Sequence, residues 1–124
     1  MAMKLEHVHL KTKDPAKAAK FYIETLGATR LETASNTRGY RLNLHGLTLN
    51  ITGFIEYQTR EQKYGLEHFA LETDDLDGTI EKMKAQDGKV LETMISKIPA
   101  HAGARICWVE GPEGVQFELI EKKK

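Results

Sequence analysis

The feature that most constrains the fold of this chain is an internal repeat within its 124 residues. The tripeptide Leu5-Glu6-His7 recurs as Leu66-Glu67-His68, an offset of 61 residues. Self-similarity at a fixed offset indicates a duplicated structural unit, so the chain should contain two copies of one supersecondary motif. Further identities at the same offset are Leu10 with Leu71, Thr12 with Thr73, Asp14 with Asp75, and Gly27 with Gly88.

Each copy begins with a short alternating stretch that ends at an aspartate, Asp14 or Asp75. An aspartate side chain accepts hydrogen bonds from the free N–H groups of a first helical turn, so a helix should follow each of them. Apolar residues at helical spacing support both helices. Glycine then closes a helix C-terminus in the left-handed conformation without a Cβ clash. The predicted helices span about 15–26 and 76–87 and end at Gly27 and Gly88.

Three short segments with strand character follow each helix, separated by residues that favour turns. The repeated order βαβββ predicts an α+β fold, with two tandem modules forming a cup-shaped mixed β-sheet and the helices packed outside. We expect a single domain over residues 1–124, with modules at 1–55 and 65–121 and a polar linker at 56–64. The predicted strands after the helices are about 28–34, 38–45, 47–55, 89–95, 104–109 and 114–120.

Alternation along the first strand of each copy separates a polar face from an apolar face. In the first copy, His7, His9 and Lys11 share one face. The residues between them should pack under the helix. In the second copy, His68 and Glu72 share the corresponding face.

The last strands of the two copies align at Gly46 and Gly114, which makes Asn50 the repeat partner of Glu118. Each copy then offers an imidazole on its first strand and an oxygen-bearing side chain on its last. Two neutral imidazoles and one carboxylate suit one divalent ion such as Fe, Mn, Zn, Co or Ni, with coordination positions left open. At each position the alternative is an ordinary half-exposed polar residue. The predicted metal ligands are His7, His68 and Glu118, with Asn50 as a weak additional ligand.

Composition argues against two classes of partner. The 18 basic and 18 acidic residues cancel, whereas nucleic-acid binding requires a concentrated basic face. No stretch is apolar enough for a membrane helix and the N-terminus lacks a signal-peptide core, so we expect a cytoplasmic protein with no membrane partner. The single cysteine, Cys107, stands between Ile106 and Trp108 and is expected in the core.

Three stretches carry a resemblance to a known family: His7–Asp14 leading to Phe21-Tyr22 and Leu26-Gly27, then Gly65–Leu71, then Gly111–Gly114 followed by Phe117–Ile120. They resemble the vicinal oxygen chelate superfamily, which includes glyoxalase I, methylmalonyl-CoA epimerase, fosfomycin-resistance enzymes, extradiol dioxygenases and bleomycin-binding proteins. The resemblance covers nearly the whole chain and is specific for the fold rather than for the reaction. It implies a homodimer, and it implies metal ligation by His7, His68 and Glu118, with Asn50 at a further ligand position.

The chain departs from the subfamilies at two positions. Glyoxalase I has a glutamate where this chain has Asn50, and an amide cannot accept a proton at neutral pH, so a glyoxalase reaction would depend on Glu118 alone. The epimerases have an amide at a comparable position. The fosfomycin enzymes have a threonine at the position of His9.

The ligand set and the resemblance favour a metal-dependent lyase or isomerase of the glyoxalase type, acting on a small substrate chelated through vicinal oxygens. The metal would stabilise the negative charge that develops when Glu118 or His9 removes a proton beside a carbonyl. Two alternatives stay open: an Fe(II) extradiol-type dioxygenase, and a metal-free drug- or metabolite-binding protein. The residues expected to contact the substrate are Lys11, Arg41, Glu72, His101 and Arg105.

Overall fold

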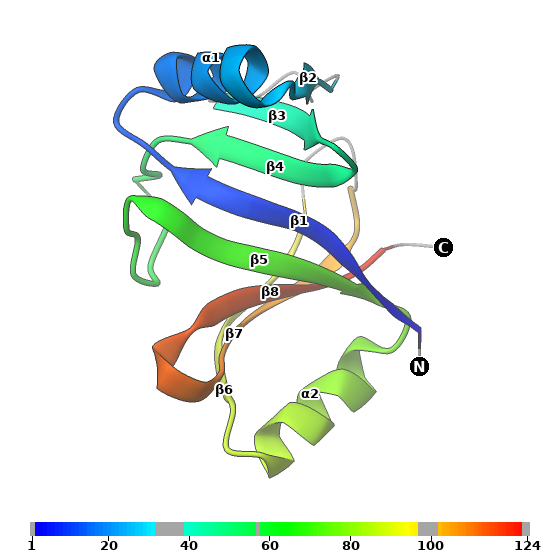
Figure 1. Ribbon diagram of the computed structural model, residues 1–124. Helices are drawn as coiled ribbons and strands as arrows, with labels where there is room; N and C mark the ends of the chain where they lie inside the picture. The colour runs from blue at the N-terminus through cyan, green and yellow to red at the C-terminus, as the bar shows by residue number, and fades with distance from the viewer. Residues whose placement is uncertain (1, 32–38, 57, 97–101, 123–124) are drawn as a thin grey trace. The chain divides into compact units, whose positions relative to one another are not determined.

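The computed structural model describes residues 2–31, 39–56, 58–96 and 102–122. Its elements follow the order βαβββ twice, which confirms the predicted α+β class with two tandem modules. None of the helices in these ranges has the length and apolar composition needed to cross a bilayer. The elements (Figure 1) are β1 (Met3–Lys11), α1 (Pro15–Leu26), β2 (Thr29–Arg30), β3 (Gly39–Leu44), β4 (Leu47–Thr52), β5 (Gly65–Thr73), α2 (Leu76–Ala85), β6 (Lys89–Ile95), β7 (Arg105–Glu110), a 3-10 turn (Pro112–Gly114) and β8 (Gln116–Glu121).

The chain divides into two compact units. Residues 7–67 form what we call the first unit, and residues 68–124 together with 1–6 form the second unit. In the first unit the strands are ordered β2-β3-β4-β1, with β1 parallel to β4 and the other pairs antiparallel. Helix α1 lies against β3 and β4 (Figure 1). The core between α1 and the sheet of the first unit consists of Ala19, Ala28, Leu42, Leu49 and Ile51, with Val8, Leu10, Ala18 and Tyr22 packed around it.

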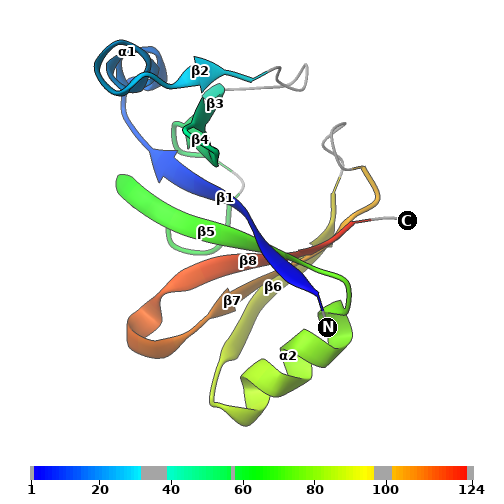
Figure 2. The ribbon, with the colours of Figure 1, turned by 45° about the vertical axis from the view of Figure 1, so that its right-hand side comes forward.

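In the second unit the strands are ordered β5-β8-β7-β6, with β5 parallel to β8. Helix α2 contacts β6 and β8 (Figure 2). Cys107 is fully buried against this helix, as predicted for a core residue. The core beneath α2 consists of Leu76, Cys107, Val109 and Leu119, with Leu71, Ile80, Met83 and Phe117 packed around it.

The N-terminal end of β1 belongs to the second unit although its sequence opens the first copy of the repeat. The backbones of Ala2 and Asp74 are joined by a 3.2 Å hydrogen bond, and Ala2 N also donates to Asp74 Oδ1 at 2.9 Å. Glu6 forms an ion pair with Lys122 at 2.9 Å. These contacts attach residues 2–6 to Asp74, which follows β5, and to Lys122, which follows β8.

The aspartates that precede the helices act as N-caps, as predicted. Asp14 Oδ1 accepts a hydrogen bond from Lys17 N at 3.1 Å, and Asp75 Oδ1 accepts one from Gly78 N at 3.0 Å. Each bond satisfies a backbone donor that has no partner within the helix. At the other end of α1, Gly27 takes the predicted left-handed conformation with φ of 76°.

The predicted role of Gly88 is wrong. Helix α2 ends at Ala85, and Asp87 rather than Gly88 adopts the left-handed conformation, with φ of 67°. Aspartate tolerates this region better than most residues because its short side chain bonds locally. Gly88 N donates to Met83 O at 3.0 Å, and a Cβ at Gly88 would collide with the Met83 side chain. Glycine is therefore required here for a close approach to the helix.

The strand pairings confirm the predicted alignment of the two copies. In the first unit, Asn50 of β4 pairs with His9 of β1. In the second unit, Glu118 of β8 pairs with Ala70 of β5. Because His9 and Ala70 are separated by the offset of the repeat, Asn50 and Glu118 occupy equivalent positions in the two units.

Candidate functional site

The face of the first unit's sheet that lies opposite α1 is polar. Residues that pair across neighbouring strands point to the same face, and alternate residues point away from it. The pairings of β1 with β4 and of β4 with β3 therefore define one continuous set of side chains. This set consists of His7, His9 and Lys11 on β1, Thr48, Asn50 and Thr52 on β4, and Arg41 and Asn43 on β3.

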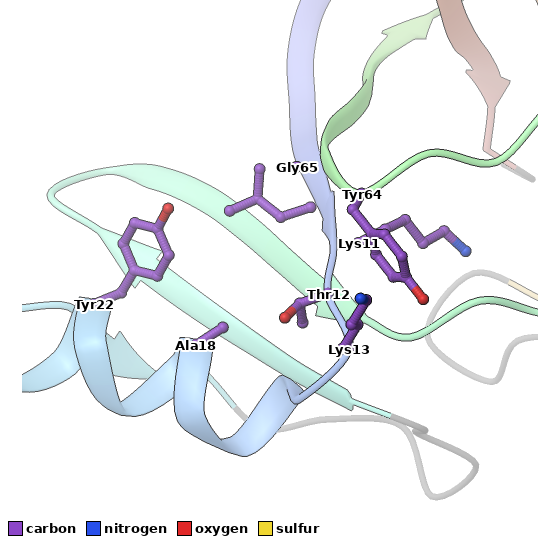
Figure 3. Close-up of a pocket in the computed structure, with 8 residues that line it drawn as sticks. Lys11, Thr12, Lys13, Ala18, Tyr22, Tyr64 and Gly65 are labelled. Carbon is purple, nitrogen blue, oxygen red and sulfur yellow. The ribbon is translucent and has the colours of Figure 1, made fainter.

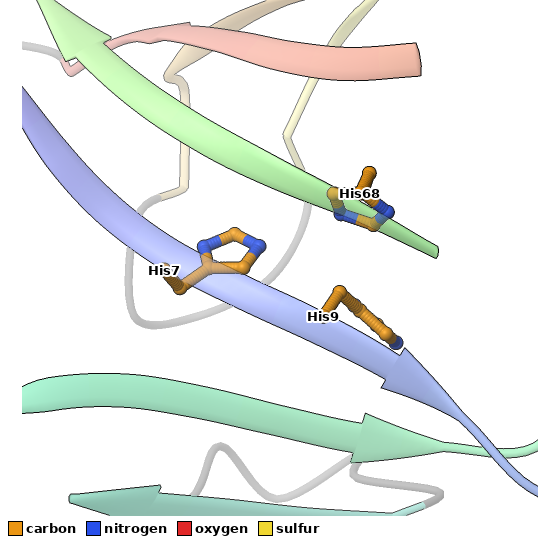
Figure 4. A group of neighbouring side chains, drawn as sticks. All are labelled: His7, His9 and His68. Atoms are coloured by element: carbon orange, nitrogen blue, oxygen red, sulfur yellow. The ribbon is translucent and has the colours of Figure 1, made fainter. Parts of the chain in front are cut away.

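His7 and His9 bring two imidazoles to this polar face, as alternation predicted. Figure 4 shows both rings extending from β1. Their centroids are 6.3 Å apart, and a ring nitrogen of one lies within 4.8 Å of a ring nitrogen of the other. His7 is buried, whereas His9 is partly exposed and its Nε2 lies 2.7 Å from Thr52 Oγ1.

Asn50 lies between His9 on one side and Arg41 on the other in the strand register. Its Oδ1 atom is buried and has no hydrogen-bond partner among the described residues. A buried acceptor without a partner loses the hydrogen bonds that water would provide, and this typically costs about 1–3 kcal/mol. A cation, or a ligand that donates a hydrogen bond, would satisfy this oxygen.

In the second unit, His68 on β5 (Figure 4) and Glu118 on β8 form a buried pair. His68 Nε2 lies 3.8 Å from Glu118 Oε1. Trp108 contacts the His68 ring edge-on, with centroids 4.5 Å apart and an interplanar angle of 89°. Such an aromatic contact favours one orientation of the imidazole.

The donor types and distances fit a divalent metal ion. Ligands that each lie about 2.0–2.2 Å from one ion are at most about 4.4 Å apart. The 3.8 Å between His68 and Glu118 falls within that span. The first unit also offers nitrogen and oxygen donors: the imidazole nitrogens of His7 and His9, and the amide oxygen of Asn50, which has no hydrogen-bond partner among the described residues.

Lys11, predicted to contact the substrate, is buried with 2% of its surface exposed. Its Nζ donates to Gln62 Oε1 at 3.0 Å and lies 3.8 Å from Glu67 Oε2. Arg60 Nη1 also donates to Glu67, at 2.8 Å. Burial lowers the pKa of Lys11; the nearby Glu67 carboxylate opposes that shift and Arg60 adds to it.

The other predicted substrate contacts lie in different settings. Arg41 is on the polar face of the first unit, in register with Asn50. In the second unit, Glu72 pairs with Lys122 at 3.0 Å, and Arg105 pairs with Asp77 at 2.6 Å and Glu121 at 3.2 Å. Hydrogen bonds from the Arg105 guanidinium lower the pKa of Asp77. His101 lies outside the described residues.

Sequence reasoning missed Thr52, Arg60 and Glu67. One signal was present for Glu67, because it belongs to the repeated tripeptide and its repeat partner is Glu6. Each of these glutamates pairs with a lysine: Glu67 with Lys11, and Glu6 with Lys122. For Thr52 one signal was available, because it lies two residues after Asn50 on β4 and therefore shares its face. For Arg60 no local signal was available, because its pairing with Glu67 depends on the path of the chain after β4.

A pocket of about 440 Å³ lies in the first unit where β1 ends against α1 (Figure 3). It is lined largely by apolar and aromatic groups, and neither His7 nor His9 contributes to it. The pocket is therefore separate from the two imidazoles of this unit. Its lining residues are Leu10, Lys11, Thr12, Lys13, Ala18, Tyr22, Tyr64 and Gly65.

Comparison with known proteins gives one family and a set of related sequences. The family described as the Glyoxalase/Bleomycin resistance protein/Dioxygenase superfamily matches residues 4–119. The lactoylglutathione lyase of Haemophilus influenzae is 29% identical over 133 residues, which cover 98% of this chain and 94% of the relative. A probable lactoylglutathione lyase of Vibrio cholerae is 28% identical, covering 95% of this chain and 90% of the relative.

Solved structures share the fold at lower sequence identity. A hypothetical protein from Bacillus halodurans superposes with a TM-score of 0.75 at 17% identity, covering all of this chain and 97% of that protein. The methylmalonyl-CoA epimerase of Mycobacterium tuberculosis gives a TM-score of 0.69 at 20% identity, covering 97% and 88%. At these identities the likeness concerns the fold.

Proposed function

The chain belongs to the Glyoxalase/Bleomycin resistance protein/Dioxygenase superfamily, and from this membership we propose that it is a metal-dependent lyase or isomerase of the glyoxalase type. The observation that carries the proposal is the buried pair of His68 and Glu118, 3.8 Å apart on neighbouring strands. Burial of an imidazole and a carboxylate does not stabilise the fold in the way that burial of apolar groups does, because polar and charged groups lose their solvation on burial. A bound ion would compensate for that loss.

We infer that one divalent ion is held by His7, His68 and Glu118, with Asn50 as a weaker ligand. The repeat supports this set, because it makes His7 equivalent to His68 and Asn50 equivalent to Glu118. The buried, unpartnered Asn50 oxygen supports it as well. Once bound, the ion would act as a Lewis acid that polarises a substrate carbonyl.

The residues of the chain would carry out the proton transfer. Of the side chains in the proposed site, Glu118 and His9 are suited to accept a proton, whereas the Asn50 amide is not. A base that removes the proton beside a polarised carbonyl generates an enolate, and return of the proton to another position completes an isomerisation. Positioned acid–base catalysis of this kind typically contributes about 10²- to 10⁴-fold to the rate.

We propose an acyl thioester with a second oxygen near its carbonyl as the substrate class. Two relatives are named as lactoylglutathione lyases. The lactoyl thioester carries a hydroxyl on the carbon next to the carbonyl, so it offers two vicinal oxygens and an exchangeable C–H.

Arg41, in register with Asn50 on the polar face, is the best supported contact for an anionic group, because a guanidinium binds carboxylates in a bidentate manner. Substrate contacts by Lys11, Glu72, His101 and Arg105 stay predictions.

The metal set is tested by metal analysis of protein purified without chelator. We expect close to one divalent ion per chain in the parent and a large loss in His68→Ala and Glu118→Gln. His45→Ala is the matched control, because His45 is exposed and bonds only to the backbone oxygen of Leu26 in the described contacts, at 2.7 Å. Negligible metal in all four proteins would contradict the metal site and favour a metal-free binding protein.

The reaction is tested by proton exchange, which requires no assumption about the final product. The metal-loaded protein is incubated in D₂O with S-lactoylglutathione, and in parallel with methylmalonyl-CoA. Deuterium entry at the carbon beside the thioester carbonyl is followed by NMR. We expect exchange with the parent and a large loss of exchange with Glu118→Gln. A fully metal-loaded parent that exchanges neither compound would contradict the proposed reaction.

A further inference from the structure

The pocket of about 440 Å³ where β1 ends against α1, which we call the α1 pocket, contains none of the proposed metal ligands. Its volume lies within the range of about 300–1,000 Å³ that is usual for small-molecule sites. Figure 3 shows Ala18 and Tyr22 of α1 on one side of the pocket and Lys13 and Tyr64 on the other. All of the lining residues lie within residues 7–67, so the first unit alone forms the α1 pocket.

The charged side chains that line the α1 pocket are both basic. They are Lys11 and Lys13, and none of the described residues in the lining carries a carboxylate. The Lys11 ammonium group lies 3.0 Å from Gln62 Oε1 and 3.8 Å from Glu67 Oε2, so it is already bound within the protein. Lys13 is exposed, and its Nζ lies 5.5 Å from the centroid of the Tyr64 ring. Of the two lysines, Lys13 is therefore the one placed to bind an anionic ligand.

Two aromatic rings contribute to the lining as well. Tyr22 is half-buried, and Tyr64 is 50% exposed. Phe54 stacks on Tyr64, with centroids 4.3 Å apart and an interplanar angle of 22°. This stack favours one orientation of the Tyr64 ring but leaves half of the residue in contact with water. A planar apolar ligand would bury part of that surface, which is favourable.

The corresponding positions of the second unit carry the opposite charge. At the offset of the repeat, Lys11 corresponds to Glu72. Lys13 corresponds to Asp74, whose Oδ1 accepts a hydrogen bond from Ala2 N at 2.9 Å. The βαβββ framework therefore accepts acidic residues at both positions, so the two lysines are not needed to build the module.

The helix residue beside the end of the strand also differs between the units. Ala18 corresponds to Thr79 in α2, whose Oγ1 lies 3.1 Å from Thr73 Oγ1 at the end of β5. This contact connects the helix to the strand in the second unit. Ala18 has no hydroxyl and cannot make such a contact with Thr12, the repeat partner of Thr73. The α1 pocket lies at this position and is lined by both Thr12 and Ala18.

We propose that the α1 pocket is a second ligand site that binds a small aromatic carboxylate, with its ring system against Tyr22 and Tyr64 and its carboxylate at the Lys13 ammonium group. Apolar contact supplies most of the affinity, and the single cation orients the ligand. A neutral ligand of the same shape keeps the ring contacts and loses the ion pair. Binding here requires neither the metal nor the proposed reaction, so the two proposals can fail separately.

The proposal is tested by titrating the ¹⁵N-labelled protein with 2-naphthoate and, in parallel, with the neutral 2-naphthalenemethanol. Shifts of backbone amide signals locate the bound probe and give its affinity. We expect 2-naphthoate to shift the amides of Thr12 and Ala18 and to bind about 5-fold more tightly than the neutral probe, as for one partly exposed ion pair. Equal affinities would overturn the proposal. Shifts confined to His9 and Asn50 would place the probe on the polar face and would also overturn it.

Two variants test the assigned contacts. Lys13→Met should weaken 2-naphthoate binding about 5-fold and leave binding of the neutral probe unchanged. Lys17→Met is the matched control, because Lys17 is exposed on α1 and lies outside the lining, and it should bind both probes like the parent. Ala18→Leu should fill the pocket and remove the shifts caused by both probes. Parent-like binding of 2-naphthoate by Lys13→Met would overturn the proposal, and this result decides it even if Ala18→Leu does not fold.

A second copy of the chain could cover the α1 pocket instead of a small ligand. Sedimentation velocity and amide spectra of the parent, recorded without probe over a series of protein concentrations, distinguish the two occupants. We expect the amides of Thr12 and Ala18 to keep their positions throughout the series. If they shift as the sedimentation coefficient rises, the pocket is an interface between copies and the small-ligand proposal is overturned.

Discussion

Lys11 brings its ammonium group into the interior of the first unit, where Glu67 and Arg60 are also enclosed. The side chains of Lys11 and Glu67 are each 1% exposed, and that of Arg60 is 6% exposed. Two cations share one carboxylate, so Glu67 cannot fully neutralise both. The loss of solvation outweighs the attraction of Glu67, and the pKa of Lys11 is lowered as a result. This cluster should make the stability of the protein depend on pH.

Replacement of Lys11 by methionine tests this dependence. With its pKa lowered from the ordinary value of 10.5, Lys11 loses its proton at a lower pH in the folded protein than in the unfolded chain. Between those two pKa values the unfolded chain binds more protons, so stability contributed by this group rises with pH. Lys11→Met should lack this rise in urea unfolding measured from about pH 7 to pH 10.5. Lys4→Met, at a position 71% exposed on the same strand, should behave like the parent. Parallel pH curves for the parent and Lys11→Met would contradict the expectation.

At this scale, the sequence predicted which side chains share a face but not what covers them. Alternation predicted that His7, His9 and Lys11 lie together, because side-chain direction on a strand depends only on position. Burial of Lys11 depends on where Arg60 and Gln62 return to β1, and no local pattern encodes that path. The His9–Thr52 contact was missed for a different reason: it depends on the parallel register of β1 and β4, which neither strand's sequence specifies alone.

The two helix C-termini show how one repeat can use different residues for the same turn. Gly27 takes the left-handed conformation after α1, whereas Asp87 takes it after α2. For most residues this conformation costs about 1–2 kcal/mol, and aspartate is one of the few exceptions. Gly88 is retained because the space beside Met83 admits no Cβ.

Substitutions at the two left-handed positions, Gly27→Ala and Asp87→Gly, should change the free energy of unfolding in opposite directions. Gly27→Ala places a Cβ on a residue with φ of 76°, and we expect a loss of about 1–2 kcal/mol in the free energy of unfolding. Contact with His45, at 3.6 Å from the added Cβ, is ordinary and should not add to the loss. Asp87→Gly removes the Cβ from a left-handed position, and we expect a gain of about 0.5 kcal/mol. Urea denaturation at neutral pH measures both, and a stabilised Gly27→Ala would contradict the role of Gly27.

The order of the elements could be predicted because an aspartate precedes each helix and a glycine lies near its end. Both residues act through contacts with the adjacent helix turn, so they can be recognised in the local sequence. Element ends were less predictable. The strand predicted at 47–55 ends at Thr52, and β2 occupies Thr29–Arg30 with residues 32–38 outside the described residues. Strand length depends on pairing with a neighbour, which a single strand's sequence does not specify.

Across the whole molecule, duplication has kept the strand registers and changed the side chains that stand on them. The row that contains His9, Asn50 and Arg41 in the first unit corresponds to Ala70, Glu118 and Trp108 in the second. Of the three polar residues on this face of β1, only His7 is kept, as His68, whereas His9 and Lys11 correspond to Ala70 and Glu72. The two units therefore offer different chemistry on one scaffold, and the proposed metal site requires donors from both.

Metal binding should consequently protect both units from hydrogen exchange, although each has its own core. An ion that binds only the folded state adds about 2.7 kcal/mol at one hundred times its dissociation constant. If its ligands include His7 in the first unit and His68 and Glu118 in the second, addition of metal should slow amide exchange in β4 as well as in β8. Glu118→Gln should abolish the protection in both strands, even though the substitution lies in only one unit. Protection confined to β8, with β4 exchanging as before, would mean that the ligands all come from the second unit, and His7 would not be among them.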